Sequence, residues 1–331
     1  MKSGEILLLT PREIQNLLTL EECIGAVEHA FRAYGEGTAV PPAVLSMHTE
    51  DGGFHVKVGL LELGRSYFAA KVNGNFPENG SRFGLPTIQG VIVLCDAGNG
   101  TPLAVMDSRD ITSLRTAAAT AVAAKFLARE NSRTATICGC GNQGSIQLKA
   151  LLRVRHIQNV FAYDKDGEKS LRFAREFVSD PKISVTSTED LSAAVRQSDI
   201  CVTCTPSRLP LLGVDDVSPG TFIAAVGADN PQKQELHPSL MAGSKIVCDL
   251  LEQCAVMGDL HHALDAGAVT LANVHAELGE VVAGKKRGRE SPEEIIIFDS
   301  TGMALQDVAA AAVLYEKAER QGCGVRLNFA A

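Results

Sequence analysis

The feature that most constrains this chain is a regular alternation that begins near residue 134. From there on, short apolar segments alternate with stretches of helical pattern. The apolar segments are 134–138, 160–164, 183–186, 200–205, 222–227 and 246–249. Neighbouring parallel strands need long crossover connections, which are usually helices. The pattern therefore predicts an α/β fold with a doubly wound parallel sheet.

A glycine motif follows the first of these segments directly and opens a predicted helix. The motif G-x-G-x-x-G is formed by Gly139, Cys140, Gly141, Asn142, Gln143 and Gly144. Glycines at these positions permit a tight turn, a close approach of pyrophosphate to the main chain and close packing of the helix, whose N-terminus favours phosphate charge. The motif, placed between its strand and its helix, predicts a Rossmann dinucleotide-binding domain.

The choice between the two nicotinamide dinucleotides depends on the end of the next strand, where Asp164 stands. A carboxylate about 20 residues after the motif accepts hydrogen bonds from the adenosine ribose diol and repels a 2′-phosphate. NAD(H) is therefore the predicted cofactor. NADP(H) is less favoured, and the neighbouring Lys165 is the argument for it.

Two polar segments come at the ends of later apolar strands, and ligands of doubly wound folds bind at the carboxyl edge of the sheet. These segments are Thr205, Pro206 and Ser207, and Val226, Gly227, Ala228 and Asp229. We expect both to lie beside the cofactor.

The first 120 residues have a different pattern, with one amphipathic helix and several alternating segments. Thr19 and Glu22 form a capping box ahead of a helical pattern that ends at Gly35 and Gly37. Segments 54–58, 67–72, 87–95 and 102–106 are typical of strands in an antiparallel meander. An Ala-rich helical run at 116–128 and a polar break at 129–133 follow, and composition alone puts a domain boundary near this break.

Bulk properties exclude several classes of function. The net charge of −8, with no basic stripe, disfavours nucleic-acid binding. The apolar runs are shorter than the roughly 18 residues that a membrane-spanning helix needs. Most of the nine cysteines lie in apolar segments, which favours a reducing cytoplasm. No metal site is expected, because Cys201 and Cys204 lack a second ligand pair, and the pair His261 and His262 is typical of an exposed loop or helix. The basic run 285–289 is likewise typical of an exposed segment and does not indicate a binding patch.

The chain resembles the ornithine cyclodeaminase and mu-crystallin family along nearly its whole length. The matching segments are 70–74, 114–118, the glycine motif, 226–231 with 233–236, 277–280 and 298–305. The family includes cyclodeaminases, alanine dehydrogenases, ketimine and iminosuccinate reductases and a thyroid-hormone-binding crystallin. The resemblance implies a homodimer in which residues 1–115, completed by 304–331, form a second α/β domain for substrate binding and dimerisation, and residues 116–303 form the Rossmann domain.

The resemblance also assigns roles that the residues alone do not. Lys71 becomes a substrate-binding lysine and Arg115 the cation that holds a substrate carboxylate, whereas by pattern alone Lys71 would be a strand-edge residue and Arg115 an exposed residue opening a helix. Two cations on an α-carboxylate would orient Cα–H toward a nicotinamide. Asp229 becomes a proton acceptor or amine ligand, with a loop cap as the alternative, and the matching segments add Thr116 and Ser300 to the cofactor site.

One departure from the family is visible at Ala43. Many members carry Pro-x-Arg before the hairpin, whereas this chain has Pro41, Pro42 and Ala43 there. His55 and Lys57 lie on one face of a predicted strand and could replace the missing arginine as substrate ligands. The alternative is that they form an exposed polar face.

Three functions follow from these expectations. The leading one is an NAD(H)-dependent reductase or dehydrogenase acting on the Cα–N bond of a small amino or imino acid. The first alternative is a cyclodeaminase-type lyase, which would use the same first step and then form a cyclic amino acid with release of ammonia. The second is a crystallin-like binding protein, which the presence of both Lys71 and Arg115 disfavours.

Overall fold

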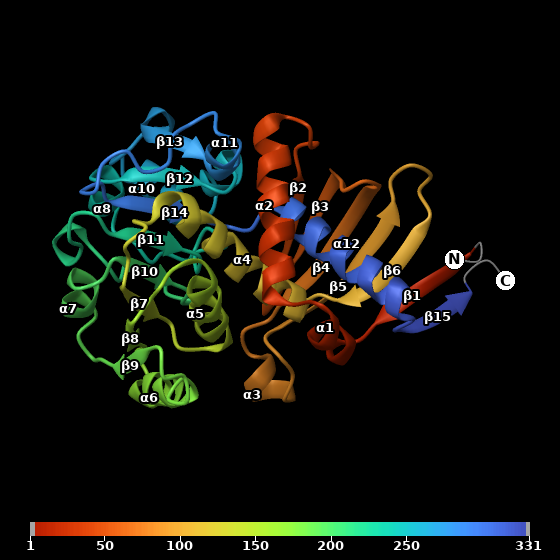
Figure 1. Ribbon diagram of the computed structural model, residues 1–331, viewed down its shortest axis with the longest axis horizontal. Helices are drawn as coiled ribbons and strands as arrows, with labels where there is room; N and C mark the ends of the chain where they lie inside the picture. Colours follow the sequence, from red (N-terminus) through yellow and green to blue (C-terminus); the bar gives the residue numbers. More distant parts are fainter. Residues whose placement is uncertain (1–3, 329–331) are drawn as a thin grey trace. The chain divides into compact units, whose positions relative to one another are not determined.

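The computed structural model describes residues 4–328, and its residues group into two compact units (Figure 1). One unit is Met1–Arg115 with Met303–Ala331, and the other is Thr116–Gly302. The second unit is therefore continuous in sequence, while the first is assembled from the two ends of the chain.

The second unit contains a parallel sheet of eight strands within the described residues, in the order β13-β12-β14-β11-β10-β7-β8-β9. The strands are β7 (Thr134–Cys138), β8 (Asn159–Tyr163), β9 (Ser184–Ser187), β10 (Ile200–Thr203), β11 (Phe222–Ala225), β12 (Lys245–Cys248), β13 (Val274–Glu277) and β14 (Ile296–Asp299). The central strands β10, β11 and β14 are buried at every position, which explains their unbroken apolar sequence. This sheet confirms the predicted doubly wound fold.

The chain changes direction across this sheet between β7 and β10. From β7 it moves through β8 to β9, and it then returns to place β10 on the other side of β7. Ligands bind outside the carboxyl ends of the strands at such a switch point. The helices of this unit are α5 (Asn142–Val154), α6 (Gly167–Glu176), α7 (Leu191–Arg196), α8 (Pro238–Ala242), α9 (Leu251–Cys254), α10 (Asp259–Asp265) and α11 (Leu278–Val282), and α4 (Arg109–Leu127) enters it from the first unit.

The first unit contains a mixed sheet of seven strands within the described residues, in the order β15-β1-β6-β5-β4-β3-β2. The strands are β1 (Glu5–Leu9), β2 (Ala43–Thr49), β3 (Gly52–Glu62), β4 (Ser66–Asn75), β5 (Ile88–Asp96), β6 (Pro102–Asp107) and β15 (Val325–Asn328). Strands β2 to β6 form the expected antiparallel meander, while β1 pairs in parallel with β6. The short helices α1 (Pro11–Leu17) and α3 (Asn79–Phe83) complete this part of the chain.

One face of this sheet is covered by the last helix, α12 (Ala304–Gln321), which packs on β3, β4 and β5 and is itself covered by α2 (Leu20–Glu36). The approach is close at Gly59, where a Cβ atom would lie 3.0 Å from Leu305 Cδ2 and 3.2 Å from Val308 Cγ2. By strand alternation, Lys57 and Leu61 belong to the same covered face. His55 and Lys57, which are half-buried, therefore do not form an exposed polar face, which was one interpretation of the sequence.

The opposite face of the sheet is apolar and open. Cross-strand pairing aligns Leu45 with Val56, Val56 with Val72, and Val72 with Val91. Leu45 is 59% exposed and Phe54, two residues from Val56 on the same face, is 45% exposed. Monomeric proteins rarely leave so contiguous an apolar surface in water.

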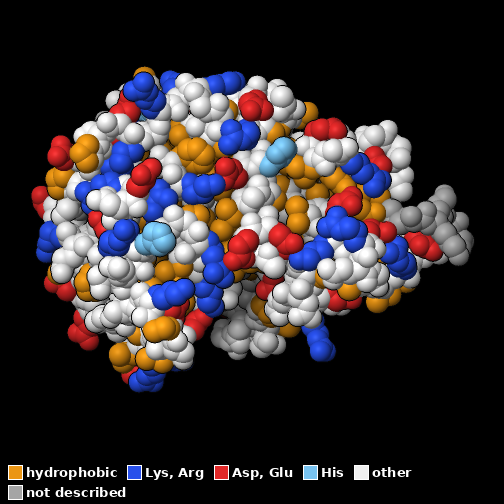
Figure 2. Space-filling view, in the orientation of Figure 1, with side chains coloured by type: hydrophobic (Ala, Val, Ile, Leu, Met, Phe, Trp, Pro, Cys, Tyr) orange, Lys and Arg blue, Asp and Glu red, His pale blue; other side chains and the backbone are white. Residues whose placement is uncertain are grey.

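The helix that carries Arg115 begins earlier than its sequence suggested. The prediction started it at residue 116, whereas α4 begins at Arg109, so Arg115 lies in the second turn and is buried rather than exposed at a helix start. Among the described residues, no helix is long and apolar enough to cross a membrane. On the face shown in Figure 2, Lys and Arg side chains are interspersed with Asp and Glu.

Candidate functional site

Three charged side chains meet beneath α12 in the first unit. Lys71 Nζ of β4 lies 2.7 Å from Asp307 Oδ2 and 2.8 Å from Oδ1, and Arg115 Nε of α4 lies 3.2 Å from Oδ1. Arg115 Nη1 also donates to Gln306 Oε1 at 3.0 Å. The structure thus brings together two of the predicted catalytic residues and adds a carboxylate between them.

All three groups are buried. Lys71 is 3% exposed, Arg115 6% and Asp307 2%. Strand alternation places Lys71 on the face covered by α12, and β4 continues to Asn75, so this lysine is not at the end of a strand. A buried charge without a partner is strongly destabilising, so the pairing is required for the fold as well as available for chemistry.

The positive charge of this cluster exceeds the negative charge. Lys57 pairs with Lys71 across β3 and β4, so a third cation lies on the same face. Burial lowers the pKa of Lys71 to about 7, and the charges of Arg115 and Lys57 act in the same direction, against Asp307. Burial alone would raise the pKa of Asp307, but the charges of Lys71 and Arg115 hold it below its usual value. A site with this balance is suited to an anion.

Asp307 was not among the residues predicted from the sequence. Its signal was nevertheless present, because Gln306 and Asp307 are polar residues directly before the small apolar run 308–313 and directly after the matching segment 298–305. A carboxylate at the start of such an apolar run, together with a lysine in a buried strand elsewhere in the sequence, indicates an internal ion pair.

The two substrate ligands proposed from the sequence lie on the covered face. His55 pairs with Asn73 in register, two residues from the Lys57 pair, and its Nδ1 lies 2.9 Å from Ser46 Oγ. Ala43 pairs with Val58, so its side chain belongs to the open apolar face instead. His55 and Lys57 therefore share a face with Lys71, whereas position 43 does not.

The glycine motif of the second unit has the geometry that a dinucleotide needs. Gly139 has φ +105°, and a Cβ atom there would lie 2.9 Å from the carbonyl oxygen of Cys204. A Cβ on Gly144 would lie 2.0 Å from the carbonyl oxygen of Gly139, whereas one on Gly141 would meet nothing within 4 Å. The outer glycines are thus required by packing, and the space at Gly141 is left for a ligand such as pyrophosphate.

Asp164 supports this loop. Its Oδ2 accepts a hydrogen bond from the main-chain N–H of Cys140 at 2.9 Å, and its Oδ1 accepts one from Asp166 at 3.0 Å. A carboxylate has about four acceptor sites, so these bonds leave capacity for a ribose hydroxyl. Of the other motif residues, Asn142 is exposed at the start of α5, and Gln143 has a buried Nε2 with no hydrogen-bond partner among the described residues.

The remaining predicted cofactor residues, apart from Thr116, lie at the carboxyl edge of the same sheet. Val226 N–H donates to Thr203 and Ser300 N–H to Ala225, so the loops that follow β10, β11 and β14 are neighbours. The hydroxyl of Ser300 donates to Asp249 and is buried, while the Ser207 hydroxyl donates to the carbonyl of Leu209. Pro206 is exposed in the same loop, and Thr116 is half-buried in α4.

Asp229 lies at the surface of this edge. Its side chain is 45% exposed, and its Oδ1 lies 2.7 Å from Lys233 Nζ. A carboxylate in this position is accessible to a ligand.

The cysteines behave as small apolar residues. All nine are free thiols, and burial raises the pKa of the Cys201 thiol far above its usual value. The Cys204 thiol donates to the carbonyl oxygens of Cys138 and Gly139. Within residues 4–328, no three His, Cys, Asp or Glu side chains are grouped as they would be around a metal ion.

Comparison with known proteins agrees with this geometry. Residues 5–322 match the model of the ornithine cyclodeaminase/mu-crystallin family. Alanine dehydrogenase of Archaeoglobus fulgidus is 42% identical over 325 residues, which cover 98% of this chain and 99% of that protein. A solved archaeal alanine dehydrogenase dimer with bound NAD has a TM-score of 0.94 at 42% identity, with 98% and 99% of the two chains covered.

A second solved structure extends the comparison to imine reduction. The Δ1-pyrroline-2-carboxylate reductase of Thermococcus litoralis, in complex with NADH and L-proline, has a TM-score of 0.90 at 34% identity, with 97% of this chain and 99% of that chain covered. The fold, the glycine motif and the full-length similarity agree, and this chain belongs to the ornithine cyclodeaminase/mu-crystallin family.

Proposed function

We propose that this protein interconverts a small α-amino acid and its imino or keto acid, with alanine as the first candidate substrate. It is an NAD(H)-dependent oxidoreductase of the Cα–N bond, as expected from the sequence. The observation that carries the substrate proposal is the buried cluster in which Lys71 and Arg115 share the single carboxylate of Asp307. The cluster leaves positive charge that an α-carboxylate would balance.

Arg115 and Lys71 hold the substrate carboxylate in this proposal. The guanidinium is fixed by Asp307 and Gln306 before the substrate arrives, so little orientation has to be achieved on binding. Lys71, whose pKa lies near 7, takes up a proton as the anion binds, because a second negative charge nearby favours the ammonium form. Lys57 and His55 extend the same polar face for the rest of the substrate.

The second unit supplies the cofactor and the group for the substrate nitrogen. Gly139, Gly141 and Gly144 hold the pyrophosphate, and Asp164 holds the adenosine ribose. When bound, NAD(H) supplies hydride transfer to or from Cα. Asp229 accepts or returns the proton of the amino nitrogen, and Lys233 Nζ lies 2.7 Å from its Oδ1 and so orients this carboxylate.

A purified-protein panel tests this proposal. Amino acids with NAD⁺, and keto acids with ammonia or methylamine plus NADH, would be followed at 340 nm with analysis of the products. Alanine, or pyruvate with ammonia, is expected to give the largest kcat/KM. Ornithine converted to a cyclic product with net release of ammonia, and no net change in NADH, would instead identify a cyclodeaminase.

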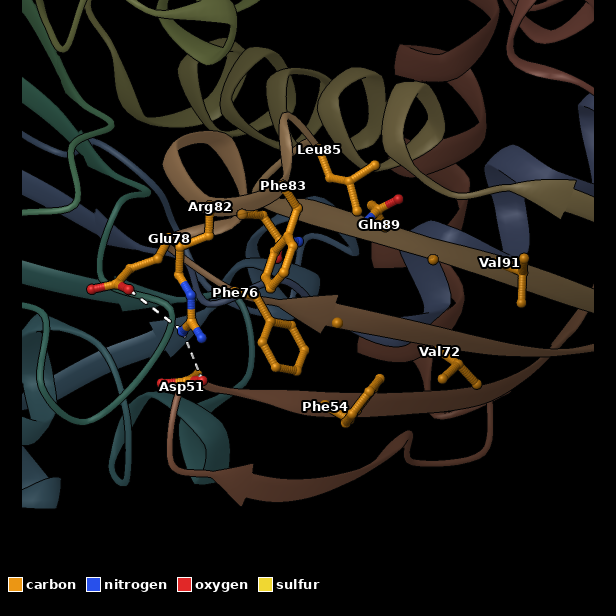
Figure 3. A pocket seen from close by; sticks show the side chains of 13 residues that line it. Asp51, Phe54, Val72, Phe76, Glu78, Arg82, Phe83, Leu85, Gln89 and Val91 are labelled. Atoms are coloured by element: carbon orange, nitrogen blue, oxygen red, sulfur yellow. Dashed lines mark hydrogen bonds and ion pairs between the residues drawn. The ribbon is translucent and has the colours of Figure 1, made fainter.

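We also propose that two copies pair through the open apolar face of the first unit. A cavity of about 750 Å³ opens on this face, and Phe54, Phe76 and Phe83 line it (Figure 3). Arg82 lies at one end, with its Nη1 2.8 Å from Asp51 Oδ2. The similar archaeal alanine dehydrogenase is a dimer in its solved structure, which supports a second copy as the cover for this face. With all nine cysteines reduced, we place the protein in the cytoplasm.

Light scattering tests the dimer. The unaltered protein is expected to show twice its chain mass of 35.1 kDa at micromolar concentration. Met47→Glu, at a residue 64% exposed on β2, puts a charge into the proposed interface and is expected to yield monomers. Leu209→Glu, at a residue 75% exposed in the second unit, is the matched control and is expected to stay dimeric. A monomeric unaltered protein would contradict the proposal.

A further inference from the structure

The second unit contains a group of buried carboxylates that the proposed mechanism does not use. Glu235, Asp259 and Asp299 are each 0% exposed. Their hydrogen-bond donors are main-chain N–H groups and a hydroxyl rather than cations. Burying carboxylates in this way is costly, so a group of them calls for an explanation.

The three carboxylates form a sequence of supports that ends at the predicted cofactor loops. Asp299 at the end of β14 accepts from the N–H of Leu260 at 2.8 Å and so holds the start of α10. Asp259, the first residue of α10, accepts from the N–H groups of Glu235 at 2.8 Å and Leu236 at 2.7 Å. The main chain of Glu235 is therefore fixed before its own carboxylate is considered.

Glu235 in turn joins two loops. Its Oε1 accepts from the N–H of Thr205 at 2.6 Å and from the Thr205 hydroxyl at 2.7 Å, and its Oε2 accepts from the N–H of Gly227 at 2.9 Å. The contact is tight, because a Cβ on Gly227 would lie 2.4 Å from the Thr205 carbonyl oxygen and 2.6 Å from Glu235 Cδ. One carboxylate thus sets the spacing between the loops that follow β10 and β11.

These loops lie on the far side of the switch point from Asp164. A dinucleotide crosses the sheet edge at that point, so if Asp164 and the glycine motif hold the adenosine half, the loops after β10 and β11 receive the nicotinamide half. We propose that Glu235 is a positioning residue, whose carboxyl group clamps the Thr205 and Gly227 loops so that the nicotinamide is held in one orientation for hydride transfer. This inference rests on the proposed function, since that function places NAD(H) at this edge.

The variant Glu235→Gln tests the clamp. The amide keeps the shape, and its oxygen can still accept from one loop, but its nitrogen cannot accept the hydrogen bond from the other loop. The first readout needs no turnover: the Kd values of NADH and of ADP-ribose, which lacks the nicotinamide, measured by calorimetry. We expect the advantage of NADH over ADP-ribose to shrink about tenfold, since one of the buried hydrogen bonds that join the two nicotinamide loops has been lost. The affinity for ADP-ribose itself is expected to stay within about threefold.

The second readout is steady-state kinetics on the best substrate of the panel. A positioning role predicts that kcat falls at least about tenfold while KM for the amino acid changes less than about threefold, because the Lys71 and Arg115 cluster is untouched. Asp199→Asn is the matched control. Asp199 is a half-buried carboxylate that accepts from the N–H groups of Arg133 and Thr134 at the amino ends of the strands, so its loss is expected to change neither readout.

The outcomes separate the clamp from the proposed function. If the unaltered protein turns over no amino or imino acid, the proposed function fails, and the ratio of the two Kd values still decides the clamp. If the ratio of the NADH and ADP-ribose Kd values is the same in Glu235→Gln as in the unaltered protein, the clamp proposal is overturned. If Glu235→Gln does not fold, Thr205→Val removes only the hydroxyl donor; it is expected to shift the ratio in the same direction by a smaller factor, and Thr205→Ser is expected to restore it.

Discussion

The two units bury ionisable side chains in opposite ways. Beneath α12, the Asp307 carboxylate is neutralised by two cations, which leaves positive charge over. At the sheet edge of the second unit, Glu235 and Asp259 are held by main-chain N–H groups. Unequal numbers of opposite charges thus leave a site that can bind an ion, whereas main-chain donors to a carboxyl group fix the position of the main chain.

The largest expected effect comes from removing the shared carboxylate in the first unit. Asp307→Asn leaves Lys71 and Arg115 buried without a counter-charge, and breaking a buried pair in this way costs about 3–5 kcal/mol of unfolding free energy. Asp259→Asn is the counterpart in the second unit. Its amide oxygen can still accept from Glu235 and Leu236, so the loss is expected to be smaller. Urea unfolding at pH 7 measures both, and equal losses would break the comparison.

The next effect concerns the positive charge left over in the first unit. Arg115→Ala and Lys71→Ala are each expected to lower kcat/KM by about 10- to 150-fold, as the loss of a charge-assisted hydrogen bond of about 1.5–3 kcal/mol implies. The affinity for NADH, measured by fluorescence titration, is expected to change less. Near-normal turnover in both variants would mean that the carboxylate is held elsewhere, with His55 and Lys57 as the first candidates.

A pH titration sharpens the same point. Burial lowers the pKa of Lys71 to about 7, so Lys71 is an ammonium below this pH and neutral above it. The affinity for a carboxylate that does not react, such as propionate, should therefore fall as the pH rises from 6 to 8, by up to about tenfold per pH unit. In Lys71→Met the profile should be flat over this range. A profile that keeps its slope in the variant would assign the titration to another group.

The smallest expected effect is on cofactor choice. Asp164, like Glu235 and Asp259, is held by main-chain donors, because it accepts from the N–H groups of Cys140 and Asp166. The unaltered protein is expected to bind NADH more tightly than NADPH. Asp164→Asn removes the repulsion of the 2′-phosphate but keeps an acceptor for the loop. The difference between the NADH and NADPH affinities should therefore become smaller, mainly because the affinity for NADPH rises. A protein that prefers NADPH from the start would refute the role of Asp164.

The sequence revealed most where the determinants are local. Short apolar strands and the glycine motif depend on neighbours within a few residues, so the doubly wound sheet was predictable. Alternation also showed that His55 and Lys57 share a face, but not which face is covered, because the cover is α12 at the other end of the chain. The partner of Lys71 was missed for the same reason, since Asp307 is 236 residues away. The start of α4 was placed too late because five of its first seven residues are polar, so the apolar pattern there is weak.

The position of α12 has a consequence for how the protein is made. The ribosome delivers the meander β2 to β6 long before it delivers residues 304–321, so the Lys71 face of that sheet emerges with neither its apolar cover nor its counter-charge. The second unit is continuous in sequence and can close as it leaves the ribosome, since domains generally fold as units in order of synthesis. The unit that is started first is therefore finished last, and its anion site comes into existence only when the final helix docks.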